Sequence, residues 1–158
     1  MRLLGIDPGS YICGYGVLEA KRTGFSVIEC GCIRASAKED IGSRLHTIYT
    51  DVLSVIDLYA PEELILEEAF FAKNPKSALV LGQVRGVVIL AAATRKVHMV
   101  EISAKQVKKR ITGNGNADKI VVQEMLRHRL NLSAASIPLD ASDALAIALA
   151  HGQEVHYV

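Results

Sequence analysis

The sequence has few cysteines, and their arrangement argues against a disulfide scaffold or a zinc site. Its 158 residues include three cysteines, Cys13, Cys30 and Cys32, which contain no C-x-x-C pair. Disulfide-rich folds use an even number of cysteines, and zinc sites use ligands in closely spaced pairs. We therefore expect three reduced thiols and no metal held by sulfur.

Long hydrophobic runs are also missing. The longest apolar stretch, residues 79–93, includes Gln83 and Arg85 and is too short to span a bilayer, so it is interpreted as a buried helix. The first residues lack the charged region, apolar region and cleavage site of a signal peptide. Although mean hydropathy is +0.24, we expect a cytoplasmic protein with no membrane partner.

Common catalytic motifs are absent as well. There is no G-x-S-x-G, no G-x-x-x-x-G-K-[ST], and the glycines of residues 113–115 lack the third glycine of a dinucleotide fingerprint. None of the five histidines has a motif around it, so each is interpreted as a surface or satisfied histidine. Serine-nucleophile and nucleotide-binding loop chemistries are thereby disfavoured.

Charge is nearly balanced overall but unevenly distributed. The formal net charge is +1, which is less basic than a dedicated nucleic-acid binder. Acidic residues outnumber basic ones over residues 38–68, whereas Lys and Arg outnumber acids over residues 95–129. A basic sector beside an acidic pocket suits a metal-dependent nuclease, and two ordinary solvated faces are the alternative.

Apolar periodicity predicts an α/β fold. An opening meander of three antiparallel strands followed by alternating helices and strands gives a five-stranded mixed sheet flanked by helices, in one domain over residues 1–158. The predicted strands cover residues 3–7, 14–18, 25–33, 63–68 and 97–102. The predicted helices cover residues 41–59, 74–96, 103–112, 117–130 and 140–151.

Four acids occur in apolar surroundings: Asp7, Glu67, Asp140 and Asp143. Asp7 ends the first buried strand and Glu67 ends another, so neighbouring parallel strands would bring the two side by side. Asp140 and Asp143 lie three residues apart, on one face of a helical turn. Local roles are the alternatives: a turn at Asp7, and a capping box in which Asp140 is the N-cap.

Clustered carboxylates repel one another unless cations neutralise them. Oxygen-only ligands suit Mg²⁺ or Mn²⁺, and two such ions roughly 4 Å apart can activate water and stabilise the leaving oxygen of a phosphodiester. The four acids therefore predict a metal-dependent phosphodiesterase.

Four segments carry a likeness to a known family: GIDPGS with GYG over residues 5–16, Glu67 with FFAKN over residues 67–74, QVK over residues 106–108, and DASDALA over residues 140–146. In this order and spacing they resemble the RuvC family of bacterial Holliday junction resolvases, along essentially the whole chain. The resemblance implies an RNase H-like fold and a homodimer. It also implies two-metal cleavage of four-way DNA junctions by paired symmetric nicks that leave 5′-phosphate and 3′-hydroxyl ends, in recombination and repair.

The resemblance also assigns residue roles. It implies that Asp7, Glu67, Asp140 and Asp143 are catalytic acids that hold two Mg²⁺ ions, with Mn²⁺ able to substitute. It places Phe70 where the family stacks an aromatic ring on junction bases, and Lys108 and Lys119 near the scissile phosphate. It further implies work with the RuvA–RuvB branch-migration complex. The helix of residues 74–96, with Gly82 and Gly86, is the candidate dimer surface; core packing is the alternative role for those glycines.

Two rival functions remain at this point. An actin-like or sugar-kinase lobe shares the Gly-Ile-Asp-x-Gly hairpin, but that superfamily needs two lobes and this chain has the length of one. A non-catalytic DNA-binding module of the same fold would bind through the basic sector, yet it would not need all four acids. Metal-dependent cleavage of junction DNA separates the rivals from a resolvase.

Overall fold

The computed structural model describes residues 1–68, 74–132 and 137–156, and its elements follow the predicted order. Except at the end of α5, the boundaries lie within a few residues of those predicted. The strands are β1 (Arg2–Asp7), β2 (Ile12–Lys21), β3 (Gly24–Arg34), β4 (Glu63–Glu67) and β5 (His98–Ile102). The helices are α1 (Ile41–Tyr59), α2 (Pro75–Thr94), α3 (Ala104–Thr112), α4 (Lys119–Arg129) and α5 (Leu139–His156).

The sheet has the strand order β3-β2-β1-β4-β5. β1, β2 and β3 form the expected antiparallel meander, whereas β4 and β5 run parallel to β1. β1 and β4 are neighbours, with Leu3 opposite Glu63 and Ile6 opposite Leu66. The five-stranded mixed sheet is thus confirmed, and the carboxyl ends of β1 and β4 meet at one edge.

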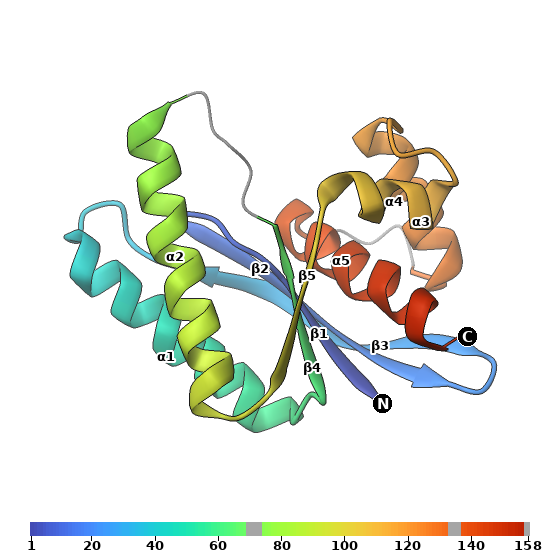
Figure 1. Ribbon diagram of the computed structural model, residues 1–158, viewed down its shortest axis with the longest axis horizontal. Helices are drawn as coiled ribbons and strands as arrows, with labels where there is room; N and C mark the ends of the chain where they lie inside the picture. The colour runs from blue at the N-terminus through green and yellow to red at the C-terminus, as the bar shows by residue number, and fades with distance from the viewer. Residues whose placement is uncertain (69–73, 133–136, 157–158) are drawn as a thin grey trace.

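Helices cover both faces of the sheet, as Figure 1 shows. α1 and α2 pack on one face around a core that includes Leu4, Ile48 and Val88. α5 crosses the other face, with α3 and α4 packed against it, around a core that includes Leu3 and Leu145. Because side chains alternate along a strand, β1 and β4 contribute to both cores.

Local signals account for most of the helix ends. Asp40 caps α1 by accepting from Ser43 N–H, and Asn74 caps α2 with Pro75 in its first turn. Ser103 and Gln106 form the predicted capping box of α3. The alternative capping role for Asp140 is wrong: α5 begins at Leu139, so Asp140 lies inside the first turn, where Ser142 N–H donates to Pro138 C=O.

α5 lies unusually close to β1 and β2 because glycines face it. A Cβ added to Gly14 would meet the Asp140 carbonyl oxygen at 1.9 Å, and one added to Gly5 would meet the Ala144 carbonyl oxygen at 2.1 Å. No other residue type fits these positions without moving the helix. The first turn of α5 is therefore held directly above the edge where β1 ends.

The interpretation of residues 79–93 as a buried helix is wrong in part. These residues belong to α2, whose buried side chains are Val84, Arg85, Val88, Ala91 and Ala92. Along its other side Leu79 and Leu90 are 67% and 55% exposed. Within the described residues, α2 is also the one helix long and apolar enough to cross a membrane by length and composition, with 28% of the relevant window buried. Packing in the core accounts for the apolar side chains on one side of α2. It does not account for the exposed apolar side chains on the other side.

The cysteines behave as expected. Cys13, Cys30 and Cys32 are free thiols. Burial raises the pKa of Cys13 to about 11, so this thiol stays protonated and unreactive near neutral pH.

Candidate active site

Asp7 and Glu67 end the two central parallel strands on the same face of the sheet. Strand alternation puts Leu3, Gly5 and Asp7 toward α5, and the register of β1 with β4 carries Glu67 to the position beside Asp7. Glu68 has the opposite parity and is exposed. The expected pairing of Asp7 with Glu67 is therefore confirmed.

The first turn of α5 brings the other two acids to the same edge. Asp140 and Asp143 lie one helical turn apart, and Gly14 on β2 packs directly against the Asp140 backbone. The charges of Asp143, Glu67 and Asp140 all act on Asp7. Four acids that are distant in the sequence thus converge on one point of the fold.

The surroundings of Asp7 and Glu67 disfavour the ionised form of both side chains. Burial, followed by the charges of Asp143, Glu67 and Asp140, raises the pKa of Asp7 from 3.8 to about 7, and Lys119 opposes the rise. Burial and the charge of Asp143 also raise the pKa of Glu67, against the opposing charges of Arg85 and Lys119. Without a further cation, Asp7 therefore keeps its proton to a higher pH than an ordinary aspartate does.

Two lysines from the opposite wall face the acids. Lys119, at the start of α4, places its Nζ 2.5 Å from Asp143 Oδ2, and this contact raises the pKa of Lys119. Lys108 of α3 lines the same cavity, together with Glu67, Lys119 and Asp143. The cavity measures about 260 Å³. It joins acids that could hold metal ions to cations that could hold a phosphate.

The donor set fits a hard divalent cation in chemical type. The converging groups are oxygen ligands, which Mg²⁺ and Mn²⁺ prefer, and a bound cation would offset the burial and the repulsion that raise the pKa of Asp7. Among the described residues, no three His, Cys, Asp or Glu side chains are arranged to hold one ion. Asp143 is instead engaged by Lys119 through Oδ2, so a metal ion would compete with that lysine for this oxygen.

Arg85 is a site residue that sequence analysis did not find. It lies on α2, is 7% exposed, and donates to the Glu67 carbonyl oxygen and to the Glu101 carboxylate. It thereby ties the end of β4 to β5 and α2. The sequence feature that could have indicated this role is an arginine within the apolar stretch of residues 79–93. In the sequence alone, that arginine served only as evidence against a membrane span.

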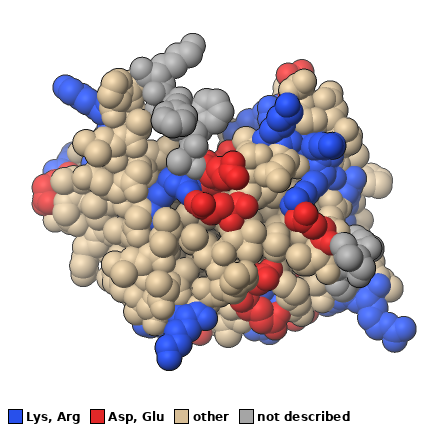
Figure 2. All heavy atoms as spheres, viewed as in Figure 1, with Lys and Arg blue, Asp and Glu red and all other residues tan. Residues whose placement is uncertain are grey.

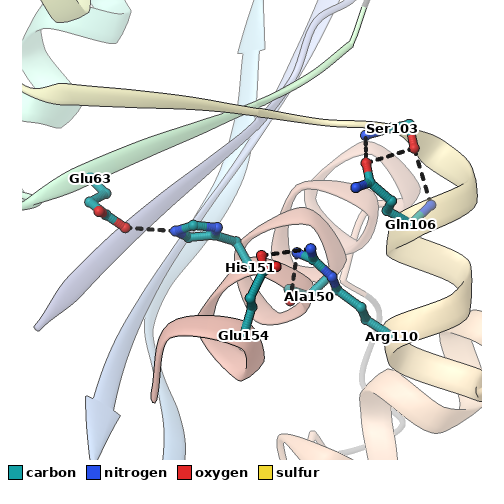
Figure 3. A network of polar contacts seen from close by, with 7 residues as sticks. All are labelled: Glu63, Ser103, Gln106, Arg110, Ala150, His151 and Glu154. Carbon is teal, nitrogen blue, oxygen red and sulfur yellow. Dashed lines mark hydrogen bonds and ion pairs between the residues drawn. The ribbon is translucent and has the colours of Figure 1, made fainter. Parts of the chain in front are cut away.

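A polar network fixes α3, and with it Lys108, against α5. Arg110 donates to the Ala150 carbonyl oxygen and pairs with Glu154 at 2.6 Å, while the Ser103–Gln106 capping box holds the start of α3 (Figure 3). In the same view, the buried His151 directly follows Ala150 on α5. Its Nε2 lies 2.7 Å from Glu63 Oε2, and this contact joins α5 to β4. His151 is thus a satisfied histidine, as predicted.

The surface around the acids has the predicted division of charge. Figure 2 shows acidic side chains gathered in the middle of the face, where Figure 1 places the end of β4 and the start of α5. Basic side chains form a band over the region of α3 and α4, which carry Lys108 and Lys119. An anionic polymer could contact the basic band while reaching the acids. Phe70, the predicted stacking residue, lies outside the described residues.

A mixed five-stranded sheet with acids at the ends of its central strands and on an adjoining helix defines the RNase H-like class of phosphodiester-cleaving enzymes. The family model for "Crossover junction endodeoxyribonuclease RuvC" matches residues 3–151. The chain belongs to the RuvC family. A relative of that name from Caldicellulosiruptor saccharolyticus is 43% identical over 152 residues, which cover 96% of this chain and 92% of that protein.

Solved structures agree with this assignment. Thermus thermophilus RuvC is similar with a TM-score of 0.91 and 32% identity, over 99% of this chain and 96% of that one. The same organism's RuvC in complex with Holliday junction substrate matches with a TM-score of 0.90, 30% identity and the same coverage. The RNase H-like resolvase fold is thus confirmed, and the chain is a member of a family of metal-dependent nucleases.

Proposed function

We propose that this chain, acting as one RNase H-like nuclease domain over residues 1–158, resolves Holliday junctions in homologous recombination and DNA repair. It would cut two strands of like polarity by paired symmetric nicks, leaving 5′-phosphate and 3′-hydroxyl ends. The observation that carries the proposal is the convergence of Asp7, Glu67, Asp140 and Asp143 at the end of β1, facing two lysines. Membership of the RuvC family supplies the choice of DNA substrate.

The four acids are the proposed ligands of two Mg²⁺ ions, for which Mn²⁺ would substitute. Bound metal ions supply an activated water and stabilise the charge on the leaving oxygen. The raised pKa of Asp7 supports this assignment, because a divalent cation would compensate the burial and the repulsion that favour its protonated form.

The lysines have a separate proposed task. Lys108 and Lys119 would hold the backbone phosphate at the cut and offset the negative charge that develops there. Lys119 would exchange its contact with Asp143 for one with the phosphate, which frees Asp143 to act as a ligand. This exchange would couple DNA arrival to assembly of the site. Phe70 is proposed to stack on an unpaired junction base.

A homodimer would account for the outer side of α2. This side presents Leu79, Ile89 and Leu90 together with Gly82 and Gly86, where an added Cβ would meet no atom of the described residues within 4 Å. A second copy packed on α2 would bury this apolar stripe and set two active sites in two-fold symmetry. A four-way junction has matching approximate symmetry, so each site would address one of two equivalent strands.

We further propose that the protein works in the cytoplasm with the RuvA–RuvB branch-migration complex. The support is the family membership alone. Dimerisation and partner binding are independent of the chemistry at the acids, so each can be tested separately.

Cleavage of a labelled synthetic four-way junction with Mg²⁺ tests the central proposal, with a linear duplex of matched sequence as the control substrate. Wild-type protein should nick the junction symmetrically and leave the duplex intact. Glu67→Gln should lower the cleavage rate at least about 100-fold, because a lost ligand removes several kcal/mol of transition-state stabilisation. Glu68→Gln changes the exposed neighbour on the other face of the strand and should cleave normally.

The outcomes separate the alternatives. Junction binding without cleavage, across several junction sequences and with Mn²⁺ as well, would indicate a non-catalytic binding module. Equal loss of cleavage in Glu67→Gln and Glu68→Gln would contradict the assignment of Glu67. Cleavage of duplex and junction at equal rates would contradict selectivity for junctions.

A further inference from the structure

A second basic cavity lies on the opposite side of Asp7 from the two active-site lysines. It measures about 330 Å³ and opens between the turn after β1 and the first turn of α2. Its polar lining consists of Ser10, Tyr11, Arg44, Lys76 and Ser77. Among the described residues the lining includes two cations, three hydroxyl groups and no carboxylate, so its chemistry favours an anion.

Arg44 is the key residue of this cavity, because it is buried and no acid among the described residues forms an ion pair with it. It is 8% exposed, its guanidinium lies 4.7 Å from the centre of the Tyr11 ring, and Nη1 is 3.4 Å from the Ser10 carbonyl oxygen. In the described part of the chain its buried Nε has no hydrogen-bond partner and no acid forms an ion pair with it. Burying a guanidinium in this state is costly unless an anion meets it.

The start of α2 adds to the positive potential of the cavity. Lys76 is exposed in the first turn of the helix, where its backbone N–H is satisfied by Asn74 Oδ1 at 3.0 Å. Ser77 follows in the same turn, at the positive end of the helix dipole. A flexible ammonium side chain at the rim and a fixed guanidinium at the base form a pair suited to a phosphate.

The position of this cavity relates it to the active site. The turn that carries Ser10 directly follows Asp7, so both sites lie at the same edge of the sheet. Arg44 and Lys76 come from α1 and α2 on one face, whereas Lys108 and Lys119 come from α3 and α4 on the other. The acids therefore lie between two basic sites.

We propose that the cavity of Ser10, Tyr11, Arg44, Lys76 and Ser77 binds a DNA backbone phosphate away from the scissile position. It would hold the junction strand on the side of the acids opposite Lys108 and Lys119, and so fix which phosphate reaches them. The proposal rests on the proposed junction-cleaving function for its ligand. Its tests measure DNA binding alone, without Mg²⁺, so that the phosphate site and the junction-cleaving function can be refuted separately.

The first test follows the Arg44 Nε–H signal by NMR, assigned as the Arg side-chain signal lost in Arg44→Lys. Because Arg44 Nε has no hydrogen-bond partner among the described residues, a bound phosphate should shift this signal as junction DNA is added. Inorganic phosphate at the same phosphate concentration is the comparison ligand. A shift with inorganic phosphate and none with saturating DNA would assign the cavity to a free anion and overturn the proposal.

The second test measures the salt dependence of junction binding for Lys76→Gln, an exposed position where folding is not at risk. Each lost phosphate contact should reduce the slope of log K against log salt concentration by about 0.9, which is about eightfold in affinity at 0.1 M salt. Lys96→Gln, an exposed lysine just beyond the other end of α2, is the matched control and should keep the wild-type slope.

Each result bears on one proposal or on both. Equal slopes for Lys76→Gln and Lys96→Gln, or an unmoved Arg44 signal in the saturated complex, would overturn the phosphate site and leave junction cleavage standing. A smaller slope and a shifted signal in a protein that never cuts DNA would support the site and overturn the nuclease proposal. A wild-type protein that binds no DNA would overturn both.

Discussion

Replacing Asp7 with asparagine should stabilise the metal-free protein while abolishing its activity. The pKa of Asp7 rises from 3.8 to about 7, chiefly through burial. At 1.36 kcal/mol for each pH unit, keeping Asp7 ionised in the folded protein costs about 4 kcal/mol. The asparagine side chain has nearly the same size and no charge, so Asp7→Asn should raise the free energy of unfolding by up to about 4 kcal/mol at pH 8.

The sign of the pH dependence follows from proton binding. Between pH 3.8 and about 7 the folded protein keeps a proton on Asp7 that the unfolded chain has lost. Proton binding by Asp7 therefore favours the folded state at low pH, and this contribution to the free energy of unfolding is lost as pH rises toward 7. The stability advantage of Asp7→Asn over wild type should grow from about 2 kcal/mol at pH 5 to about 4 kcal/mol at pH 8.

Urea unfolding in the presence of EDTA, at pH 5 and pH 8, measures this difference. Asp51→Asn removes an exposed acid of α1 and should change stability by less than about 0.5 kcal/mol. Added Mg²⁺ should stabilise wild type and leave Asp7→Asn nearly unchanged, because a cation that binds the folded state raises its stability. An Asp7→Asn protein no more stable than Asp51→Asn at pH 8, or an advantage that does not grow with pH, would refute the reasoning.

Three further changes test other parts of the structure. Gly14→Ala should lower stability by about 1–3 kcal/mol and reduce junction cleavage more than tenfold, because its Cβ would displace the Asp140 backbone 1.9 Å away. Urea unfolding and cleavage rates measure this. The control is Gly42→Ala on the exposed first turn of α1, where the added Cβ would lie 3.1 Å from one side-chain atom, Asp40 Oδ1, and so would displace no backbone. Arg85→Met should reduce the cleavage rate of bound junction with little change in junction affinity, since it frees the Glu67 carbonyl oxygen; an unchanged single-turnover rate would contradict that role. Leu79→Glu should convert a dimer to monomers in analytical ultracentrifugation. Leu58→Glu changes a leucine of α1 with similar exposure and should leave the dimer intact. A monomeric wild type would contradict the proposed dimer.

Much of the fold could be predicted because its signals are local. The alternation of apolar residues marked the strands, the period of residues 41–59 marked α1, and the capping box at Ser103 marked the start of α3. The likeness to the RuvC family then supplied the class of enzyme, which the family match confirms. The sequence also indicated the candidate acids, since Asp7 and Glu67 each end an apolar run. The alternation of helices and strands was compatible with a sheet in which their two strands are neighbours.

Other features depend on contacts between distant segments. The parallel pairing of β1 with β4 determines that Asp7 and Glu67 meet, and the glycines of β1 and β2 determine how closely Asp140 approaches them. Burial by surrounding elements, rather than local sequence, raises the pKa of Asp7.

The buried arginines show the same division. In the sequence, Arg44 is one polar residue in an amphipathic helix and Arg85 one charge in an apolar helix. Folding decides that Arg85 supports the Glu67 backbone and that Arg44 is buried with no hydrogen-bond partner for Nε among the described residues. The exposed apolar side of α2 is likewise visible only in the fold, because periodicity reports that residues are apolar and only packing determines which of them are covered. The sequence by itself determined the elements and the candidate acids, whereas the tertiary structure decided which charges face one another and which are left without partners.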